Sequence, residues 1–406
     1  MRRQIFLSAC FLIIATRAAC LPTDCIGTDV TCNPANSLLY TLQIQSSQAC
    51  ELDRNQIIQP ENFAAVQAEL QAQSALGSAG SPLFSTIPST QTGAEKWAGG
   101  VLAANGMIYG IPRDNNNVLV IDPNTHAVTT FPTGTTGSLK WNGGVLGPNG
   151  MIYGIPQNGN DLLVIDPNTN TANIVPAGTS GTNKWRGGVL ASNGMIYGIL
   201  QHSNDLIVID PNTNTATTVP AGTSGTNKWF GGVGAPNGRI YGIPQNINDL
   251  LVIDPNANTA TAVPAGTSGA DKWVGGVLAP NGMIYGIPHG SNDLLIIDPN
   301  TNTATTVPAG TSGTTKWSSG VPAANGMIYG IPRDSNDLLI IDPNTNTATT
   351  VPAGTSGTNK WIGGVLAPNG KIYAIPRDSN DILVVDPQSN GRLCDALITS
   401  AYWNKH

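Results

Sequence analysis

Charged side chains are scarce in this chain. Aspartate, glutamate, lysine and arginine make up 11% of its 406 residues, and the formal net charge is -6. A protein that binds nucleic acid presents a basic face, so this balance excludes nucleic acid as the expected partner. Beyond the N-terminal segment, no apolar run is long enough to span a bilayer. The only membrane attachment to expect is therefore a lipid anchor.

Residues that commonly carry catalysis are also few. All four glutamates, Glu51, Glu61, Glu69 and Glu95, precede Trp97, the first tryptophan of a repeated stretch, so we expect no glutamate within the repeats. The four histidines are scattered, and no nucleophile elbow, Walker loop or His-x-x-x-His pair is present. The sequence therefore predicts no catalytic residue, no metal site and no cofactor.

The chain instead contains one stretch repeated seven times. Its tryptophan falls every 44 residues, without an insertion or deletion between copies. A period of this length is typical of solenoids, propellers and other arrays. The tryptophans are Trp97, Trp141, Trp185, Trp229, Trp273, Trp317 and Trp361.

Each copy contains four short extended segments separated by turn signals. In the third copy they cover residues 187–191, 195–199, 205–210 and 216–220. The pair Asn193-Gly194 predicts a tight hairpin turn between the first two, with both residues at positive φ. The lack of 3.6-residue periodicity, with the abundance of Gly, Pro, Asn and Thr, excludes a helical solenoid.

The third segment predicts how the copies pack. Residues 162–165, Leu-Leu-Val-Ile, are apolar at consecutive positions, so both faces of this strand should be buried. Radially packed sheets meet that demand and leave only short edges. We therefore predict an all-β fold, a seven-bladed β-propeller of four-stranded antiparallel blades. Because residues 84–88 match a fourth strand and the last copy lacks one, this N-terminal strand should complete the last blade and close the ring.

Both ends of the chain are predicted to lie outside the ring. Residues 1–19 have the basic start, apolar core and small residues of a secretory signal peptide. Residues 20–81 should form a small Cys-rich segment, a short helix and a linker, residues 82–391 the propeller, and residues 392–406 a C-terminal tail. The protein is therefore expected to be exported, either secreted or held at the outer membrane or cell surface as a lipoprotein.

The cysteines leave two outcomes open. If Cys20 is the lipidated first residue of a mature lipoprotein, an even number remains and can form two disulfides. If a signal peptidase cleaves after Ala18, an odd number remains. Neither a histidine nor a Cys-x-x-Cys pair accompanies them, which favours disulfides over a metal site. The disulfide candidates are Cys25, Cys32, Cys50 and Cys394.

Positions that differ between copies gather in two loops, the one leading into the first strand and the one between the second and third strands. Both should open on the same face of the disc. Arg-Asp dipeptides occupy the second loop in copies one, six and seven, which become neighbours when the ring closes. We expect this charged sector to be a recognition surface, with neutral variation of exposed loops as the alternative. The candidate ligand-binding residues are Arg113, Asp114, Arg333, Asp334, Arg377 and Asp378, with Arg186, His202, Phe230 and His289 elsewhere on the rim.

Charges that recur in the copies are expected to be structural. A lysine precedes every repeat tryptophan, and an aspartate opens the third strand in six copies. We expect a ring of Lys–Asp pairs and turn caps. The turn at residues 166–170 has oxygen-bearing side chains at alternate positions, but it lacks the glycine and the distal glutamate of a calcium loop. A structural turn is therefore predicted.

Residues 363–373, Gly-Gly-Val-Leu-Ala-Pro-Asn-Gly-Lys-Ile-Tyr, followed by Asp386-Pro387, resemble the repeats of YncE-like, SMP-30-like and virginiamycin B lyase-like β-propellers. The resemblance covers residues 82–387 and implies the propeller architecture. Its lyase-like members imply a metal-assisted site with His and Glu on one face. Residues 25–50, with Cys-Asn-Pro-Ala-Asn-Ser-Leu-Leu at 32–39, look like the leader of spirochaete-type surface lipoproteins, which implies export and envelope attachment.

These features together favour a binding or interaction module. We predict that its variable loop face recognises an extracellular protein, peptide or glycan. A metal-assisted lyase or lactonase-like enzyme using the same face, and a purely structural envelope protein, are the alternatives.

Overall fold

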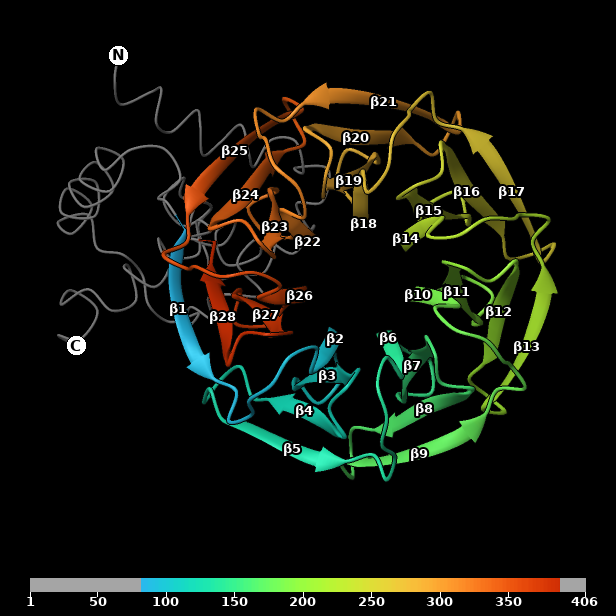
Figure 1. Ribbon diagram of the computed structural model, residues 1–406, viewed down its shortest axis with the longest axis vertical. Coiled ribbons are helices and arrows are strands. Elements are labelled where there is room, and N and C mark those ends of the chain that lie inside the picture. The colour runs from blue at the N-terminus through green and yellow to red at the C-terminus, as the bar shows by residue number, and fades with distance from the viewer. Residues whose placement is uncertain (1–81, 388–406) are drawn as a thin grey trace, which may run out of the picture. The chain divides into compact units, whose positions relative to one another are not determined.

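The computed structural model describes residues 82–387. These residues form 28 β-strands in seven four-stranded antiparallel sheets, which are arranged as blades around a central axis (Figure 1). The predicted seven-bladed propeller is therefore confirmed. Within this part of the chain, no helix has the length and apolarity needed to cross a membrane. The predicted signal peptide, helix, lipidated Cys20, disulfides and tail lie outside the described residues and stay predictions.

The first and second strands of each blade are the inner hairpin. The first strands are β2 (Trp97–Leu102), β6 (Trp141–Leu146), β10 (Trp185–Leu190), β14 (Trp229–Gly234), β18 (Trp273–Leu278), β22 (Trp317–Pro322) and β26 (Trp361–Leu366). The second strands are β3 (Ile108–Pro112), β7 (Ile152–Pro156), β11 (Ile196–Leu200), β15 (Ile240–Pro244), β19 (Ile284–Pro288), β23 (Ile328–Pro332) and β27 (Ile372–Pro376). The first strands lie nearest the axis (Figure 1).

The third and fourth strands lie progressively farther from the axis (Figure 1). The third strands are β4 (Asn117–Ile121), β8 (Asp161–Asp166), β12 (Asp205–Asp210), β16 (Asp249–Asp254), β20 (Asp293–Asp298), β24 (Asp337–Asp342) and β28 (Asp381–Asp386). The fourth strands are β5 (Val128–Pro132), β9 (Thr171–Pro176), β13 (Thr215–Pro220), β17 (Thr259–Pro264), β21 (Thr303–Pro308) and β25 (Thr347–Pro352), with β1 (Leu83–Pro88) in the last blade.

The N-terminal strand closes the ring as predicted. The order of the last sheet is β1-β28-β27-β26, so the first strand of the chain completes the blade that the end of the repeats begins. The pairing is antiparallel and places Ile87 opposite Ile382. Because β1 pairs with β28, the last blade has four strands like the other six, and its third strand has no unpaired edge.

The core lies between neighbouring blades. In the third copy, Leu206 and Ile207 are both fully buried although they point to opposite faces of the sheet, which confirms the prediction from their consecutive apolar residues. Trp185 packs in the cluster that also contains Tyr153 and Ile155 of the preceding blade. Its indole Nε1 donates to the carbonyl oxygen of Asp205 at 2.8 Å, so the ring is both buried and fixed in direction.

The innermost strands approach one another closely at their first glycine, a position that is glycine in six blades and Ser319 in the blade of β22. Gly143 has a φ of +77°, and a Cβ on it would lie 3.0 Å from the Cα of Gly187 in the next blade. Each first strand also carries a β-bulge here; in β10 the register shifts between Trp185 and Gly188. A bulge redirects the side chains within it. Arg186 lies inside this bulge, at a position that holds a different residue in each copy.

The Asn-Gly hairpins differ from the prediction in one respect. Gly106 has a φ of +81°, but Asn105 is not among the residues with positive φ. The amide of Gly106 donates to the carbonyl of Ala103 at 3.0 Å, so the turn is closed three residues back, and only the glycine adopts the left-handed conformation. The expected pair of positive-φ residues is therefore wrong: Asn105 stays at negative φ and caps the turn through its Oδ1, which accepts from the amide of Met107 at 3.0 Å.

Asn105 also joins neighbouring blades on the face that carries the Asn-Gly hairpins and the Asp-Pro turns, which is called here the constant face. The Asn105 Nδ2 donates to the carbonyl of Pro167 at 2.9 Å and to the hydroxyl of Tyr109 at 3.0 Å. The Tyr109 hydroxyl in turn donates to Oδ1 of Asn170 at 2.8 Å. Pro167 and Asn170 belong to the Asp-Pro-Asn-Thr-Asn turn of the next blade. This turn is structural, as predicted, and Asp166 Oδ1 accepts from the amide of Asn168 at 2.9 Å.

The lysine before each tryptophan does not pair with aspartate. Lys184 Nζ donates to the carbonyl oxygens of Gly181 at 3.0 Å and of Gly159, in the preceding blade, at 2.8 Å. It also lies 5.7 Å from the centroid of the Trp185 ring. Within residues 82–387 no lysine forms an ion pair. The expected ring of Lys–Asp pairs is therefore wrong, because backbone carbonyls satisfy the buried ammonium groups.

Candidate functional site

Two sets of loops meet on the variable face. The amide of Arg113, which begins the loop between the second and third strands, donates to the carbonyl of Lys96 at 2.9 Å. The amide of Lys140 in the next blade donates to the carbonyl of Arg113 at 3.1 Å. These backbone bonds hold one residue of each blade at an equivalent place around the axis. The seven residues are Arg113, Gln157, Gln201, Gln245, His289, Arg333 and Arg377.

Most of these residues reach towards the next blade. Gln157 Nε2 donates to Oδ1 of Asn183 at 2.8 Å, and Arg333 Nε donates to Oδ1 of Asn359 at 2.9 Å. The receiving residue always precedes the constant lysine and has a φ near +50°. Asparagine tolerates this conformation well. Five residues receive such a bond, Glu95, Asn183, Asn227, Asp271 and Asn359, and Leu139 and Thr315 occupy the same position in the other two copies.

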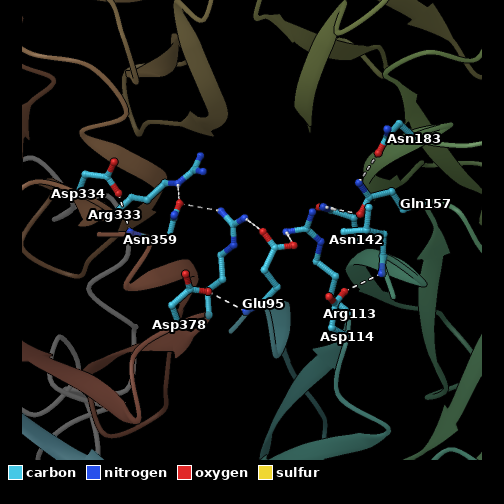
Figure 2. A network of polar contacts seen from close by, with 12 residues as sticks. Glu95, Arg113, Asp114, Asn142, Gln157, Asn183, Arg333, Asp334, Asn359 and Asp378 are labelled. Carbon is cyan, nitrogen blue, oxygen red and sulfur yellow. Dashed lines mark hydrogen bonds and ion pairs between the residues drawn. The ribbon is translucent and has the colours of Figure 1, made fainter. Parts of the chain in front are cut away.

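A glutamate stands at this position in the first copy and joins two arginines (Figure 2). The Glu95 Oε2 lies 3.1 Å from Nη1 of Arg113, and its Oε1 pairs with Nη2 of Arg377. Arg377 also donates from Nη1 to Oδ1 of Asn359 at 3.1 Å. The two arginine side chains are 7% and 8% exposed, whereas that of Glu95 is 32% exposed. The carboxylate therefore lies on the open side of a nearly buried cationic pair.

Burial and neighbouring charges shift the pKa values of this group. Burial alone would raise the pKa of Glu95, but Arg113 and Arg377 outweigh it, and the pKa is lowered. Burial lowers the pKa of Arg113, and the neighbouring cation Arg377 lowers it further, while Glu95 opposes both. Arg333 is subject to the same effects, burial first and Arg377 next. The predicted contiguous sector of charge from copies one, six and seven is thus present as three mutually repelling guanidinium groups with one carboxylate between two of them.

Arg186 belongs to the same group although it comes from the third blade. Burial lowers its pKa to about 9, and Arg113, Arg333 and Arg377 add to that shift. Its guanidinium carbon lies 4.5 Å from the ring centroid of Phe230, a contact that favours a cation. Its Nε is buried and has no hydrogen-bond partner.

The aspartates of the predicted site have a different role. Asp114 Oδ1 accepts from the amide of Leu139 at 2.6 Å. Asp334 and Asp378 likewise accept from the amides of Asn359 and Glu95, at 2.6 and 2.7 Å. These bonds hold the positive-φ residue of the next blade in place. The arginines of the three dipeptides therefore supply the charged side chains of the site, and the aspartates support its loops.

The two predicted histidines are not brought together. His202 Nε2 lies 3.0 Å from Oδ1 of Asn227. His289 is buried, with Nδ1 2.8 Å from the carbonyl oxygen of Trp317 and Nε2 3.2 Å from Nη1 of Arg333. Among residues 82–387 no three His, Cys, Asp or Glu side chains gather as metal ligands would. The side chains present do not fit the His-and-Glu metal site that the lyase resemblance implies.

Sequence reasoning missed Glu95. The prediction excludes it from the repeats because it counts the copies from each tryptophan, and Glu95 precedes Trp97 by two residues. The structure corrects this, since the loop before the tryptophan belongs to the variable face. A signal was available: the position before the constant lysine holds a different residue type in several copies, as the position after the tryptophan does.

Comparisons with known proteins agree with the fold. Two overlapping segments, residues 58–240 and 232–391, match the family described as a repeat of unknown function (DUF6923). No curated protein sequence matches the chain significantly. The expected likeness to virginiamycin B lyase-like propellers is confirmed at the level of the fold.

Three solved structures illustrate that likeness. A streptogramin B lyase superposes with a TM-score of 0.66 at 14% identity, over 76% of this chain and 99% of the lyase. Virginiamycin B lyase from Staphylococcus aureus gives 0.65 at 14% identity, over 75% and 99%. The extracellular domain of a putative one component system from B. thetaiotaomicron gives 0.57 at 14% identity, over 74% of this chain but only 42% of that one. At these identities the likeness concerns the fold alone.

Proposed function

Because the chain belongs to the DUF6923 repeat family, whose function is unknown, we propose from the site itself that the protein is a binding module. Its ligand is bound on the variable face, around the axis of the propeller. The carrying observation is that the Glu95 carboxylate joins Arg113 and Arg377, from the first and last blades, while Arg333 of the sixth blade and Arg377 both donate to Oδ1 of Asn359. Nothing in the packing of the blades requires this, since other copies carry Gln or His at the position of Arg113.

The surrounding scaffold supports this proposal. Each loop of the face is fixed by backbone hydrogen bonds to the next blade, and five of the seven also by an aspartate or asparagine cap. Side chains held in this way lose little freedom when a ligand binds, which favours affinity. The opposite face, where every copy repeats the same Asn-Tyr-Pro contacts and the same Asp-Pro turn, offers seven nearly identical surfaces and no group of neighbouring arginines.

The proposed setting is outside the cell. The N-terminal features predicted from the sequence favour export, as a secreted protein or as a lipoprotein at the cell surface or outer membrane. An extracellular protein, peptide or glycan is then the proposed partner. The likeness to an extracellular domain of a putative bacterial signalling system is compatible with such a role.

A binding screen with charge-matched variants tests the proposal. Purified mature protein is assayed against panels of glycans, peptides and extracellular proteins, beside Arg113→Gln/Arg377→Gln. Glutamine occupies the same place in copies two to four, so this variant should fold. The control is Arg239→Gln/Lys371→Gln, which removes the same charge from hairpin turns on the opposite face. A ligand lost by the first variant and kept by the control is expected. A ligand bound equally by both variants would contradict the proposal.

A further inference from the structure

The arginine group lacks enough anions. Within residues 82–387, the only carboxylate within 4.0 Å of any arginine or lysine is that of Glu95, which pairs with Arg113 and Arg377. Arg333 is hydrogen-bonded only to neutral groups, Asn359 and His289. Arg186 contacts the face of Phe230. A partly buried cation without a paired anion is costly, so the site favours binding an anion from outside.

Glu95 shows which kind of anion fits. Its two carboxylate oxygens are shared between two guanidinium groups, one from the first blade and one from the last. Guanidinium groups match the planar geometry of a carboxylate. The Glu95 backbone is held by Asp378, at 2.7 Å from its amide nitrogen, while its side chain is more exposed than either arginine with which it pairs. Rotation of that side chain would free both arginines without disturbing the loop.

We propose that the ligand of this face carries a carboxylate, which takes the place of the Glu95 carboxylate between Arg113 and Arg377. Glu95 is then an internal competitor that neutralises the arginines in the free protein. Arg333 and Arg186 provide the excess positive charge that favours a second anionic group over Glu95 alone. This inference rests on the proposed function and adds the chemical class of the ligand.

Substitution of the competitor provides the test. Glu95→Gln keeps the size of the side chain but removes the charge that occupies the arginines. Binding of succinate at pH 7 is measured by isothermal titration calorimetry for the wild type, Glu95→Gln, Arg113→Gln/Arg377→Gln and the control Arg239→Gln/Lys371→Gln. Succinamide serves as the uncharged ligand of similar shape, and inorganic phosphate as the other oxyanion.

The expected result is succinate binding that becomes about tenfold tighter in Glu95→Gln, which corresponds to about 1.4 kcal/mol. Binding should be lost in Arg113→Gln/Arg377→Gln and unchanged in the control, and succinamide should not bind. As a second measurement, succinate should raise the midpoint of thermal unfolding of Glu95→Gln more than that of the wild type, because the variant leaves two arginines facing each other without an anion.

Several results would overturn the inference: no succinate binding to Glu95→Gln, equal affinity of this variant and the wild type, equal binding of succinamide, or a gain for phosphate without one for succinate. The failure of this inference can be distinguished from the failure of the proposed function. A ligand from the screen that needs Arg113 and Arg377, while Glu95→Gln leaves succinate binding unaffected, would keep the binding module and reject the carboxylate.

Discussion

His289 should make the stability of the propeller depend on pH in a window where few other groups titrate. The side chain is 2% exposed. Its Nδ1 lies 2.8 Å from the carbonyl oxygen of Trp317 and therefore donates, so Nε2 is the acceptor for Arg333 Nη1 at 3.2 Å. Protonation of Nε2 would remove this hydrogen bond and place a second cation beside Arg333. The neutral ring is therefore the form that the fold selects.

The size of this pH dependence follows from the shift in the pKa of His289. Burial is the largest effect on His289 and lowers its pKa to about 4, and Arg333 acts in the same direction. The hydrogen bond to Trp317 and the carboxylates of Asp271 and Asp334 oppose this shift without cancelling it. The unfolded chain has a histidine pKa of about 6.5. Between these values the unfolded state binds one more proton, so stability falls as the pH falls. At about 1.4 kcal/mol for each pH unit, the loss between pH 7 and pH 5 is about 2 kcal/mol.

His289→Gln isolates this contribution, because glutamine stands at the equivalent position in three other blades. The free energy of unfolding is measured by urea titration at pH 7 and pH 5 for both proteins. The wild type should lose about 2 kcal/mol more than the variant between the two pH values. Glu95 does not interfere, because both proteins contain it and its contribution, lost as the pH falls below its unfolded-state pKa of about 4.3, cancels in the comparison. Equal losses in both proteins would refute the assignment of a buried neutral histidine.

Two further predictions concern the contacts between blades. Gly143→Ala should destabilise the protein by about 1–3 kcal/mol more than Gly150→Ala, because both have φ near +80° but only the first Cβ would meet backbone of the next blade; equal urea midpoints would show that the innermost strands are not in tight contact. Tyr197→Phe should cost about 1–2 kcal/mol of stability by leaving Asn193 and Asn258 without the hydroxyl. The same variant should leave ligand affinity unchanged, and a weakened ligand would contradict the division of roles between the two faces.

The sequence predicted the architecture well because the repeat contains its own packing rules. A fixed 44-residue period and consecutive apolar residues such as those at 162–165 specify seven sheets buried on both faces. The unpaired strand at 84–88 predicted the closure. The sequence pattern alone could not predict the conformation of single residues. Asn105 looked like a turn residue, and its bonds to Tyr109 and the next blade became visible only when the blades were placed side by side.

The candidate site was predicted only in part. The Arg-Asp dipeptides and their closeness after ring closure followed from the spacing of the copies. The separate roles of Arg113 and Asp114 did not, because they depend on the direction of each side chain. Arg186 was chosen only as a variable residue, and its electrostatic coupling to arginines from three other blades is a property of the closed ring. Glu95 was missed because the boundary of a copy was drawn at the tryptophan rather than at the loop before it.

Near-identical copies make the exceptions informative. Of the five arginines within residues 82–387, four lie on the variable face, and Arg239 follows a hairpin turn of the other. On the constant face, Asn105 and its equivalents repeat the same contact from blade to blade. The account therefore assigns stability to one face and recognition to the other.

Hydrogen–deuterium exchange of the protein with and without a ligand from the screen tests that assignment most directly. The account predicts slower exchange in the loops at 93–96, 113–116, 333–336 and 377–380, with no change in the hairpin turns at 103–106 and 367–370. Slower exchange confined to those hairpin turns or to the outer strands would place the ligand elsewhere and contradict the central claim.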